Sequence, residues 1–345
     1  MNFESDNVSG AAPEILEALA AANAGAVSAY GADDLTRRAE RMISDVFETE
    51  AAVFLVATGT ASNSLALAAM TPPYGSIFCH RDSHINQDEC GAPELQTGGA
   101  KLVTVAGAAA KIDPVEFRQA AYFPDHGVHA VERNALSLTQ ATECGTLYSV
   151  SEIRALSEIA VERGMAVHMD GARFSNAMAS LNASPAEMTW KAGVDILSFG
   201  ASKNGTLAAE AIVVFNPALA QTIGRRRKRA GHLFSKMRFL AAQWVAFLTD
   251  DLWLRNARHA NAMARQMEAG LRTVQGVRIA HPVEANQLFV SLPEATIQAL
   301  EAVGFTFYRW PDEDPGMIRL VTGFDTDPAH VDFFIETARG ISENT

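Results

Sequence analysis

Cysteine is scarce in this chain of 345 residues, and long apolar runs are absent. The three cysteines, Cys79, Cys90 and Cys144, are too few and too irregularly spaced for a disulfide framework or a zinc cluster. No apolar run approaches the ~20 residues that a membrane-spanning helix needs, and the mean hydropathy is +0.02. These absences argue against a disulfide-stapled scaffold, a metal centre and an integral membrane protein.

Positive charge is also limited, because the net charge is −12. That balance argues against a nucleic-acid partner. One basic run, RRRKR at 225–229, departs from it. A solvated helix face is a better interpretation of this run than a nucleic-acid patch, since no aromatic residues interleave with the charges. The opening stretch MNFESDNVSG lacks the basic and apolar regions of a secretory signal, which favours the cytoplasm.

Short apolar runs alternate with helical patterns between residues 35 and 254. The runs that predict strands are 51–57, 75–80, 101–106, 135–138, 165–170, 195–200 and 211–215. A helix is predicted over 149–164, with Ser149 or Ser151 as its N-cap and Gly164 at its end. Alternation of this kind predicts a large α/β domain with a mostly parallel sheet.

The two ends of the chain differ from this central part. Residues 1–34 predict an extended arm followed by a helix over 12–23, and the arm is expected to lie across the rest of the molecule. A long helical region is expected over 217–270. Within a smaller α+β domain at 255–345, strands are predicted over 276–282, 287–293, 304–310 and 317–324, with helices over 294–304 and 327–341.

The stretch TGTASN at 58–63 follows one predicted strand and opens a helix. Ligands of open α/β sheets bind outside the carboxyl ends of the strands. Gly59 permits a sharp turn there, and Thr60 adds a hydroxyl to the backbone N–H groups of a helix N-terminus. The stretch is either a phosphate cradle or an ordinary strand-to-helix turn.

Three further polar side chains fall at or near strand ends. Asp170 closes the strand at 165–170, and it either binds a cationic partner or serves as a helix cap or turn residue. Arg173 either points into the same pocket or forms a surface ion pair. His84 either stacks on a flat ring and takes a proton, or is an ordinary loop histidine.

Lys203 lies in SFGASKNG, among small residues between two apolar runs. Lysine is rare in this sequence, where arginine supplies most of the positive charge. Partial burial between strands would lower the pKa of the amine and make it a nucleophile able to form a Schiff base. The alternative is a lysine whose stem is buried and whose amine reaches solvent.

These features together predict a pyridoxal phosphate site. A phosphate cradle, a carboxylate for a ring nitrogen and a lysine for an aldehyde are the three groups by which a protein holds that cofactor. The sequence supplies them in the order Gly59-Thr60, Asp170 and Lys203, at successive strand ends.

Several stretches of the chain resemble the low-specificity L-threonine and phenylserine aldolases of the β-eliminating lyase group. They include DSHINQDECGAPE at 82–94, LTQATECGTLYS at 138–149, HMDGARFSNA at 168–177, GVDILSFGASKNG at 193–205 and RLVTGFDT at 319–326. The resemblance covers nearly the whole chain. It implies the fold-type I architecture of pyridoxal phosphate enzymes, with a large α/β domain and a smaller C-terminal domain.

The resemblance also implies roles for the residues that hold the cofactor. Lys203 would form the Schiff base, Asp170 would pair with the pyridine nitrogen, and Arg173 would reach the ring oxygen. Gly59 and Thr60 would hold the phosphate.

Further roles concern His84 and the substrate. His84 would stack on the cofactor ring. The substrate carboxylate would be bound by Ser5, Arg173 and Arg319.

The family resemblance further implies a homo-oligomer, a dimer of dimers in which neighbouring subunits share active sites. Lys228, Arg229 and Arg238 match positions near that subunit boundary, which gives the basic run a third interpretation as an anion-binding segment, with Arg229 directed to the phosphate.

Where many relatives carry a second histidine, this chain has Thr142 and Glu143. The candidate bases are therefore His84, directly or through a water, and then Glu143.

The expected activity is a retro-aldol cleavage. L-Threonine, L-allo-threonine or an aryl analogue such as phenylserine would yield glycine and an aldehyde. Three alternatives remain open: β-elimination from another amino acid, racemisation, and a non-catalytic binding protein on the same fold.

Overall fold

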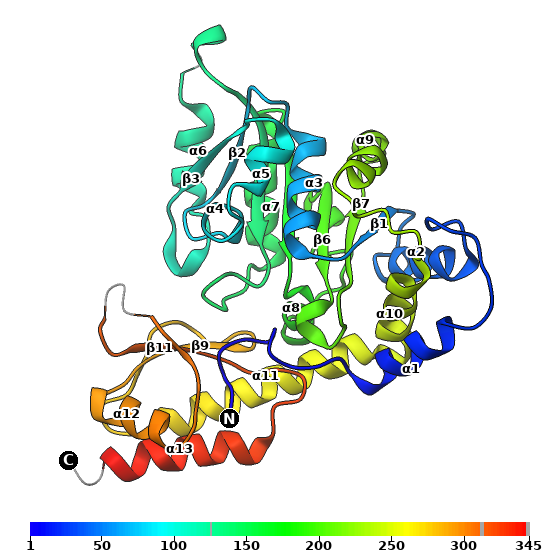
Figure 1. Cartoon of the computed structure of the whole chain (residues 1–345). Coiled ribbons are helices and arrows are strands. Elements are labelled where there is room, and N and C mark those ends of the chain that lie inside the picture. Colours follow the sequence, from blue (N-terminus) through cyan, green and yellow to red (C-terminus); the bar gives the residue numbers. More distant parts are fainter. Residues whose placement is uncertain (125, 311–313, 343–345) are drawn as a thin grey trace.

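A seven-stranded sheet forms the larger part of the protein (Figure 1). The computed structural model describes residues 1–124, 126–310 and 314–342. The strand order is β1-β7-β6-β5-β4-β2-β3. The strands are β1 (Ala52–Val56), β2 (Gly75–His80), β3 (Lys101–Val105), β4 (Glu132–Thr139), β5 (Ala166–Gly171), β6 (Ile196–Gly200) and β7 (Glu210–Val214).

Strand β7 is antiparallel to both of its neighbours, whereas β3, β2, β4, β5 and β6 pair in parallel. The predicted mostly parallel sheet is thus confirmed. The reversal at β7 was not predicted, and it has a simple cause. The connection 201–209 between β6 and β7 is too short for the crossover that a parallel neighbour needs. This short connection carries Lys203.

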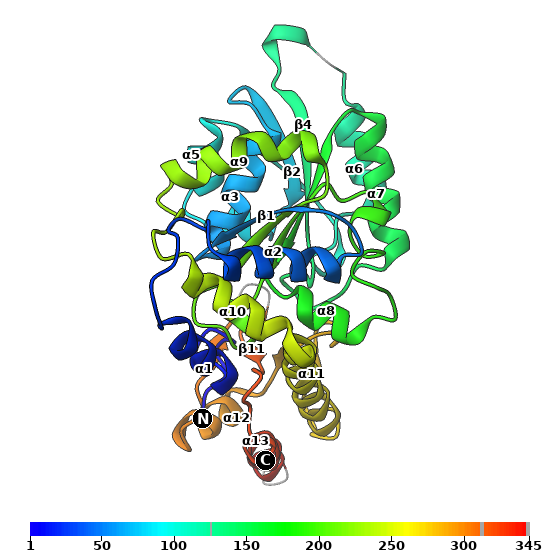
Figure 2. The ribbon, with the colours of Figure 1, turned by 90° about the vertical axis from the view of Figure 1, so that its right-hand side faces the viewer.

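Helices cover both faces of the large sheet (Figure 2). One face packs against α3 (Gly59–Met70) and α9 (Pro217–Arg229). The other packs against α2 (Asp34–Val46), α6 (Pro114–Tyr122), α7 (Val150–Glu162), α8 (Phe174–Ser180) and α10 (Arg238–Leu248). Because side chains alternate along a strand and Val167 and Met169 face the second group, His168 and Asp170 face α3.

A second, four-stranded antiparallel sheet has the order β10-β11-β9-β8. Its strands are β8 (Arg278–Ile279), β9 (Gln287–Ser291), β10 (Tyr308–Arg309) and β11 (Met317–Val321). Helices α11 (Leu252–Leu271), α12 (Glu294–Ala302) and α13 (Pro328–Ser342) pack on one face, where Leu288, Val290 and Leu320 are buried. The alternate positions, Gln287 and Arg319 among them, therefore belong to the other face.

The N-terminal arm joins the second sheet to the Lys203 connection. The Phe3 N–H donates to the Thr306 carbonyl at 2.8 Å, and the Val321 N–H donates to the Phe3 carbonyl at 2.9 Å. Just before α1 (Pro13–Ala22), the Ala12 N–H donates to the Gly205 carbonyl at 2.8 Å. The arm is therefore held at both ends, and Ser5 and Asp6 lie between the two anchors.

Each predicted strand is present, but several bounds differ: the strands expected over 276–282 and 304–310 are only the two-residue β8 and β10, and the strand expected over 135–138 extends to the full length of β4. Ser149 rather than Ser151 caps α7, in a capping box with Glu152. The long helical region expected over 217–270 consists of α9, α10 and α11, which are separated where Gly231, Asp250 and Asp251 adopt positive φ. The short helices α4 (His84–Gln87), α5 (Ala92–Thr97), α6 and α8 were not predicted.

No helix in the described part of the chain is both long and apolar enough to cross a bilayer.

Candidate active site

Asp170 is a buried carboxylate near the carboxyl end of β5. Its Oδ2 accepts a hydrogen bond from Nδ2 of Asn63 at 2.8 Å, and its Oδ1 accepts one from the Ala172 N–H at 2.9 Å. The residue is only 4% exposed. Asp170 does not cap α8, which Arg173 precedes. Its position therefore fits a site residue better than a helix cap.

Lys203 lies in the 3-10 turn Ser202–Asn204 and is partly buried. Burial lowers the pKa of its amine, and the charge of Arg173 lowers it further, while Asp6, Asp170 and Glu210 act in the opposite direction. Within the described residues, no hydrogen bond or ion pair engages Nζ. The amine thus lies among charged side chains without a fixed partner, as a nucleophile requires.

Helix α3 begins at Gly59, as the TGTASN stretch predicts. The Thr58 hydroxyl caps the helix by accepting from the Ala61 N–H at 3.2 Å. By their position in the first turn, the N–H groups of Gly59 and Thr60 have no partner within the helix. Nothing lies within 4 Å of where a Cβ on Gly59 would be, so the space beside this residue is open. An anion could approach these N–H groups directly.

Arg173 forms a buried ion pair with Asp6 of the N-terminal arm. Its Nε and Nη2 donate to the two carboxylate oxygens at 2.7 and 2.9 Å, and Nδ2 of Asn286 adds a hydrogen bond at 3.0 Å. Burial alone would raise the pKa of Asp6, but the charges of Arg173 and Lys203 outweigh it and hold that pKa below its usual range. Arg173 is therefore not in a surface ion pair.

We expect Asp6→Ala to lower the free energy of unfolding by about 3–5 kcal/mol, because the change leaves the buried Arg173 charge unpaired. Since the pKa of Asp6 is lowered on folding, the wild-type contribution is present above pH 3.8 and is lost as pH falls through the folded pKa. Urea denaturation at neutral pH measures the effect.

Asp34→Ala is the matched control, because the Asp34 side chain is 99% exposed in its pair with Arg37. It should change the unfolding curve little. Equal curves for the Asp6 and Asp34 variants would contradict the inferred role of the buried pair.

His84 begins the short helix α4 and contacts two carboxyl groups. Its Nδ1 lies 2.9 Å from Oε1 of Glu89, and its backbone N–H donates to Oε1 of Glu143 at 3.0 Å. The Thr139 hydroxyl donates to the same Glu143 oxygen at 2.9 Å. The hydrogen bond to Glu89 raises the pKa of His84. Burial raises the pKa of Glu143 to about 7.

Arg319 reaches this neighbourhood from β11 of the second sheet. Its Nε and Nη2 donate to Oε1 of Gln287 at 3.2 and 2.8 Å. Burial lowers the pKa of Arg319 to about 10, and the nearby Arg173 charge contributes. Ser5 lies beside Asp6, with its hydroxyl 3.5 Å from the Asp6 carboxylate. Ser5, Arg173 and Arg319 thus gather around Asp6.

The basic run is not part of this cluster within one chain. Arg229 is exposed at the end of α9, and no contact between described residues joins it to Gly59 or Thr60. Lys228 lies over the Tyr30 ring at 4.7 Å, and Arg238 donates to the Gly25 carbonyl at 3.0 Å. The assignment of Arg229 to phosphate binding stays a prediction.

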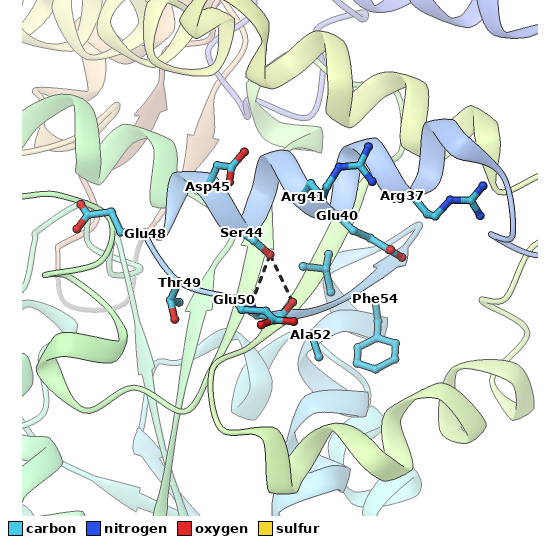
Figure 3. A pocket seen from close by; sticks show the side chains of 12 residues that line it. Arg37, Glu40, Arg41, Ser44, Asp45, Glu48, Thr49, Glu50, Ala52 and Phe54 are labelled. Carbon is cyan, nitrogen blue, oxygen red and sulfur yellow. Dashed lines mark hydrogen bonds between the residues drawn. The ribbon is translucent and has the colours of Figure 1, made fainter.

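A separate hollow lies between α2 and β1 (Figure 3). Its lining alternates basic and acidic side chains, Arg37 and Arg41 beside Glu40 and Asp45. None of the predicted site residues borders it. Because its charges are mixed, this hollow favours no ligand of one sign, and we do not regard it as the active site.

Several buried residues of the cluster were not predicted from the sequence, among them Asp6, Asn63 and Glu89. Asn63 could have been noticed as a large polar residue in a helix whose first turns are otherwise made of small residues. Asp6 is next in sequence to Ser5, which the family resemblance assigns to the substrate carboxylate. Glu89 carries no local signal, because its partners are defined only by the folded loop.

The sheet with one reversed strand, and the cluster at the carboxyl ends of its parallel strands, define an enzyme of the fold-type I architecture. A serine palmitoyltransferase solved with pyridoxal phosphate has this fold, with a TM-score of 0.71 at 15% identity, covering 100% of this chain and 87% of that one. The chain belongs to the β-eliminating lyase family, whose model matches residues 2–295.

Relatives within this family agree closely with the chain. A low-specificity L-threonine aldolase of Pseudomonas aeruginosa is 47% identical over 325 residues, which cover 94% of this chain and 93% of the relative. The structure of Leishmania major threonine aldolase superposes with a TM-score of 0.93 at 28% identity and covers 99% of both chains. The resemblance drawn from the sequence motifs is confirmed.

Proposed function

We propose that this protein is a pyridoxal phosphate-dependent, low-specificity L-threonine aldolase. It cleaves L-threonine, L-allo-threonine or an aryl β-hydroxy-α-amino acid such as phenylserine to glycine and an aldehyde. The observation that carries the proposal is the amine of Lys203, which no described residue engages in a hydrogen bond or ion pair and which lies near the charges of Arg173, Asp6 and Asp170.

The site supplies one chemically suitable group for each of three parts of the cofactor. Lys203 offers an amine to the aldehyde, Asp170 offers a fixed carboxylate to the ring nitrogen, and the open turn at Gly59 and Thr60 offers N–H groups to the phosphate. When bound, pyridoxal phosphate draws electrons from a bond next to the amino nitrogen of the substrate.

Asp170 would pair with the ring nitrogen of the bound cofactor and would favour its protonated form, because an opposite charge favours the cationic form. The hydrogen bonds from Asn63 and Ala172 stabilise the ionised carboxylate and fix its direction. Lys203 would hold the cofactor through its aldehyde, and when it is not so engaged its amine would be able to move a proton.

Arg319 and Arg173 bind the substrate carboxylate, with Ser5 as an additional donor. A guanidinium group binds a carboxylate through two parallel hydrogen bonds, which sets the orientation of the substrate as well as its affinity. With the carboxylate fixed, the bond between Cα and Cβ is the one held in the reactive orientation. His84, or secondarily Glu143, removes the proton of the β-hydroxyl group.

We expect Arg319→Ala to lower kcat/KM for L-threonine by roughly 10²-fold, since a charged hydrogen-bonding pair is lost. Steady-state rates of glycine release measure this. Arg278→Ala is the control, because Arg278 belongs to the same sheet but forms an exposed pair with Asp314. An unchanged kcat/KM in the Arg319 variant would remove its assigned role.

Arg319 follows residue 254, whereas Lys203 and Asp170 precede it. We therefore propose that the parts 35–254 and 255–345 form the site together, with the arm of 1–34 contributing Ser5 and Asp6. The exposed basic end of α9, in a chain of net charge −12, supports a role for Arg229 in an anion site of a neighbouring subunit within a dimer of dimers.

The reaction class is tested by product analysis. Incubation with L-threonine should release glycine and acetaldehyde in equal amounts. Ammonia with a keto acid would indicate β-elimination instead, and inverted substrate without fragments would indicate racemisation. A protein with neither products nor the visible absorbance of lysine-bound pyridoxal would be a binding protein on this fold.

A further inference from the structure

A single amide nitrogen joins two buried carboxylates beside the site. Nδ2 of Asn63 donates to Oδ2 of Asp170 at 2.8 Å and to Oε1 of Glu89 at 2.8 Å. An amide nitrogen carries two protons, so both are used. The opposite orientation of the amide would point its oxygen at two carboxylates and leave both without this donor. The surrounding residues therefore determine which way Asn63 faces.

Glu89 in turn determines the state of the His84 ring. The Glu89 side chain is fully buried, and its Oε1 lies 2.9 Å from Nδ1 of His84 while it accepts from Asn63. An ionised carboxylate oxygen can only accept, so in the pair with the ionised Glu89 the proton lies on Nδ1. A proton on Oε2 of Glu89 would leave Oε1 as an acceptor and would not change the position of the proton on His84.

The second ring nitrogen of His84 is left available. Nε2 makes no hydrogen bond to any described residue, and the His84 side chain is 39% exposed. In the neutral ring, Nδ1 carries the only proton, so Nε2 holds a lone pair that can accept one. The Glu143 carboxylate fixes the backbone of His84 through its N–H and does not contact the ring nitrogens.

We propose that Glu89 and Asn63 are positioning residues for His84: Asn63 fixes the Glu89 carboxylate against Asp170, and Glu89 holds His84 in the tautomer whose Nε2 accepts a proton. The use of this nitrogen as the base for the β-hydroxyl group rests on the proposed function. Asn63 also links the carboxylate assigned to the cofactor ring with the pair assigned to proton transfer.

The charges around His84 give this arrangement a pH dependence. The hydrogen bond and charge of Glu89 raise the pKa of His84, as does the charge of Asp170, while burial and Lys203 lower it. The base acts in its neutral form, so kcat/KM should fall as pH drops through this pKa. Glu89→Gln keeps an oxygen acceptor but removes the charge. Because this charge raises the pKa of His84, the acidic limb of the kcat/KM profile should move to lower pH in the variant.

The direct test is the tautomer of His84 in the purified, cofactor-loaded protein. Long-range ¹H–¹⁵N correlation spectra at a pH above the titration, assigned with a His84→Gln variant, should show the proton on Nδ1. A proton on Nε2 would overturn the proposal. Because this measurement uses the wild-type chain, it decides the matter even if a variant fails to fold.

Kinetics provide the second test. Glu89→Ala should lower kcat for L-threonine by roughly 10²-fold with little change in KM, because the base loses its orientation. Asn63→Ala should lower kcat in the same way. Glu89→Gln should lose less activity while moving the acidic limb to lower pH. Asp82→Asn is the charge-matched control, since Asp82 is exposed and lies two residues before His84.

The outcomes separate this proposal from the proposed function. The positioning role would be overturned if the acidic limb of the kcat/KM profile did not move in Glu89→Gln. It would also be overturned if that limb moved equally in Asp82→Asn. Cleavage of threonine by a protein whose His84 carries its proton on Nε2 would refute the positioning role alone. A proton on Nδ1 in a protein that releases no glycine would support the positioning and refute the aldolase.

Discussion

Replacing Lys203 with alanine should abolish covalent attachment of pyridoxal phosphate and lower kcat for threonine cleavage by roughly 10³-fold or more. The amine is the one group of the site that can form a Schiff base, and within the described residues no ion pair restrains it. Its loss removes both the anchor of the cofactor and a group that moves protons. The visible spectrum and the rate of glycine release measure the two effects.

Lys191→Ala is the matched control for this change. Lys191 pairs with Glu48 at 2.6 Å at the surface, where both side chains are exposed, and it contacts none of the site residues named above. This variant should keep the absorbance and the activity of the wild type. A Lys203 variant that behaved in the same way would show that the lysine has no part in the reaction.

Asp170→Asn should lower kcat by about 10²–10³-fold, because the shape of the side chain is kept while its charge is lost. The neighbouring histidine on the same strand supplies no charge that could act in its place. His168, two residues earlier on the same face of β5, is held between the Ser137 and Ser198 hydroxyls at 2.9 and 3.0 Å. Burial lowers the pKa of His168 to about 4, so it is neutral at pH 7 and adds no competing positive charge.

Steady-state kinetics and the spectrum of the bound cofactor check the Asp170 prediction. Asp113→Asn is a suitable control, because Asp113 caps α6 at the surface and asparagine caps equally well. The control should retain full activity. Wild-type turnover in the Asp170 variant would mean that the ring nitrogen needs no carboxylate, which contradicts the assigned role.

Local patterns explain why Lys203 and Asp170 could be predicted from the sequence. Each lies at or just beyond the end of a short, mostly apolar run, and such a run is typical of a strand buried on both faces. The strands at 75–80 and 195–200 were placed to within a residue for the same reason. Helix α7 was equally clear, because its capping box and Gly164 are local signals.

The partners that complete the site could not be predicted, because they are distant in sequence. Asp6 and Arg173 are 167 residues apart, and Asn63 and Asp170 are 107 apart. No periodic pattern specifies which polar residues meet over such separations. The short helices α4 and α5 were missed for a different reason, since a helix of one or two turns has too few residues to show a period.

The antiparallel direction of β7 was not predicted, although the sequence contained the information for it. The brevity of the connection 201–209 was visible in the sequence, and it excludes a parallel crossover. The reversal brings Glu210 beside Gly200 in the register of β6 and β7 and keeps the Lys203 turn tight against the sheet. The direction of this strand could therefore have been inferred from loop length alone.

The most direct measurement of the central claim is peptide mapping after borohydride reduction of the purified protein. Reduction converts a lysine-bound pyridoxal phosphate into a stable adduct that mass spectrometry can locate. The account predicts one modified lysine, Lys203, and loss of the adduct when L-threonine is added in excess before reduction. An adduct on another lysine, or none on Lys203, would contradict it.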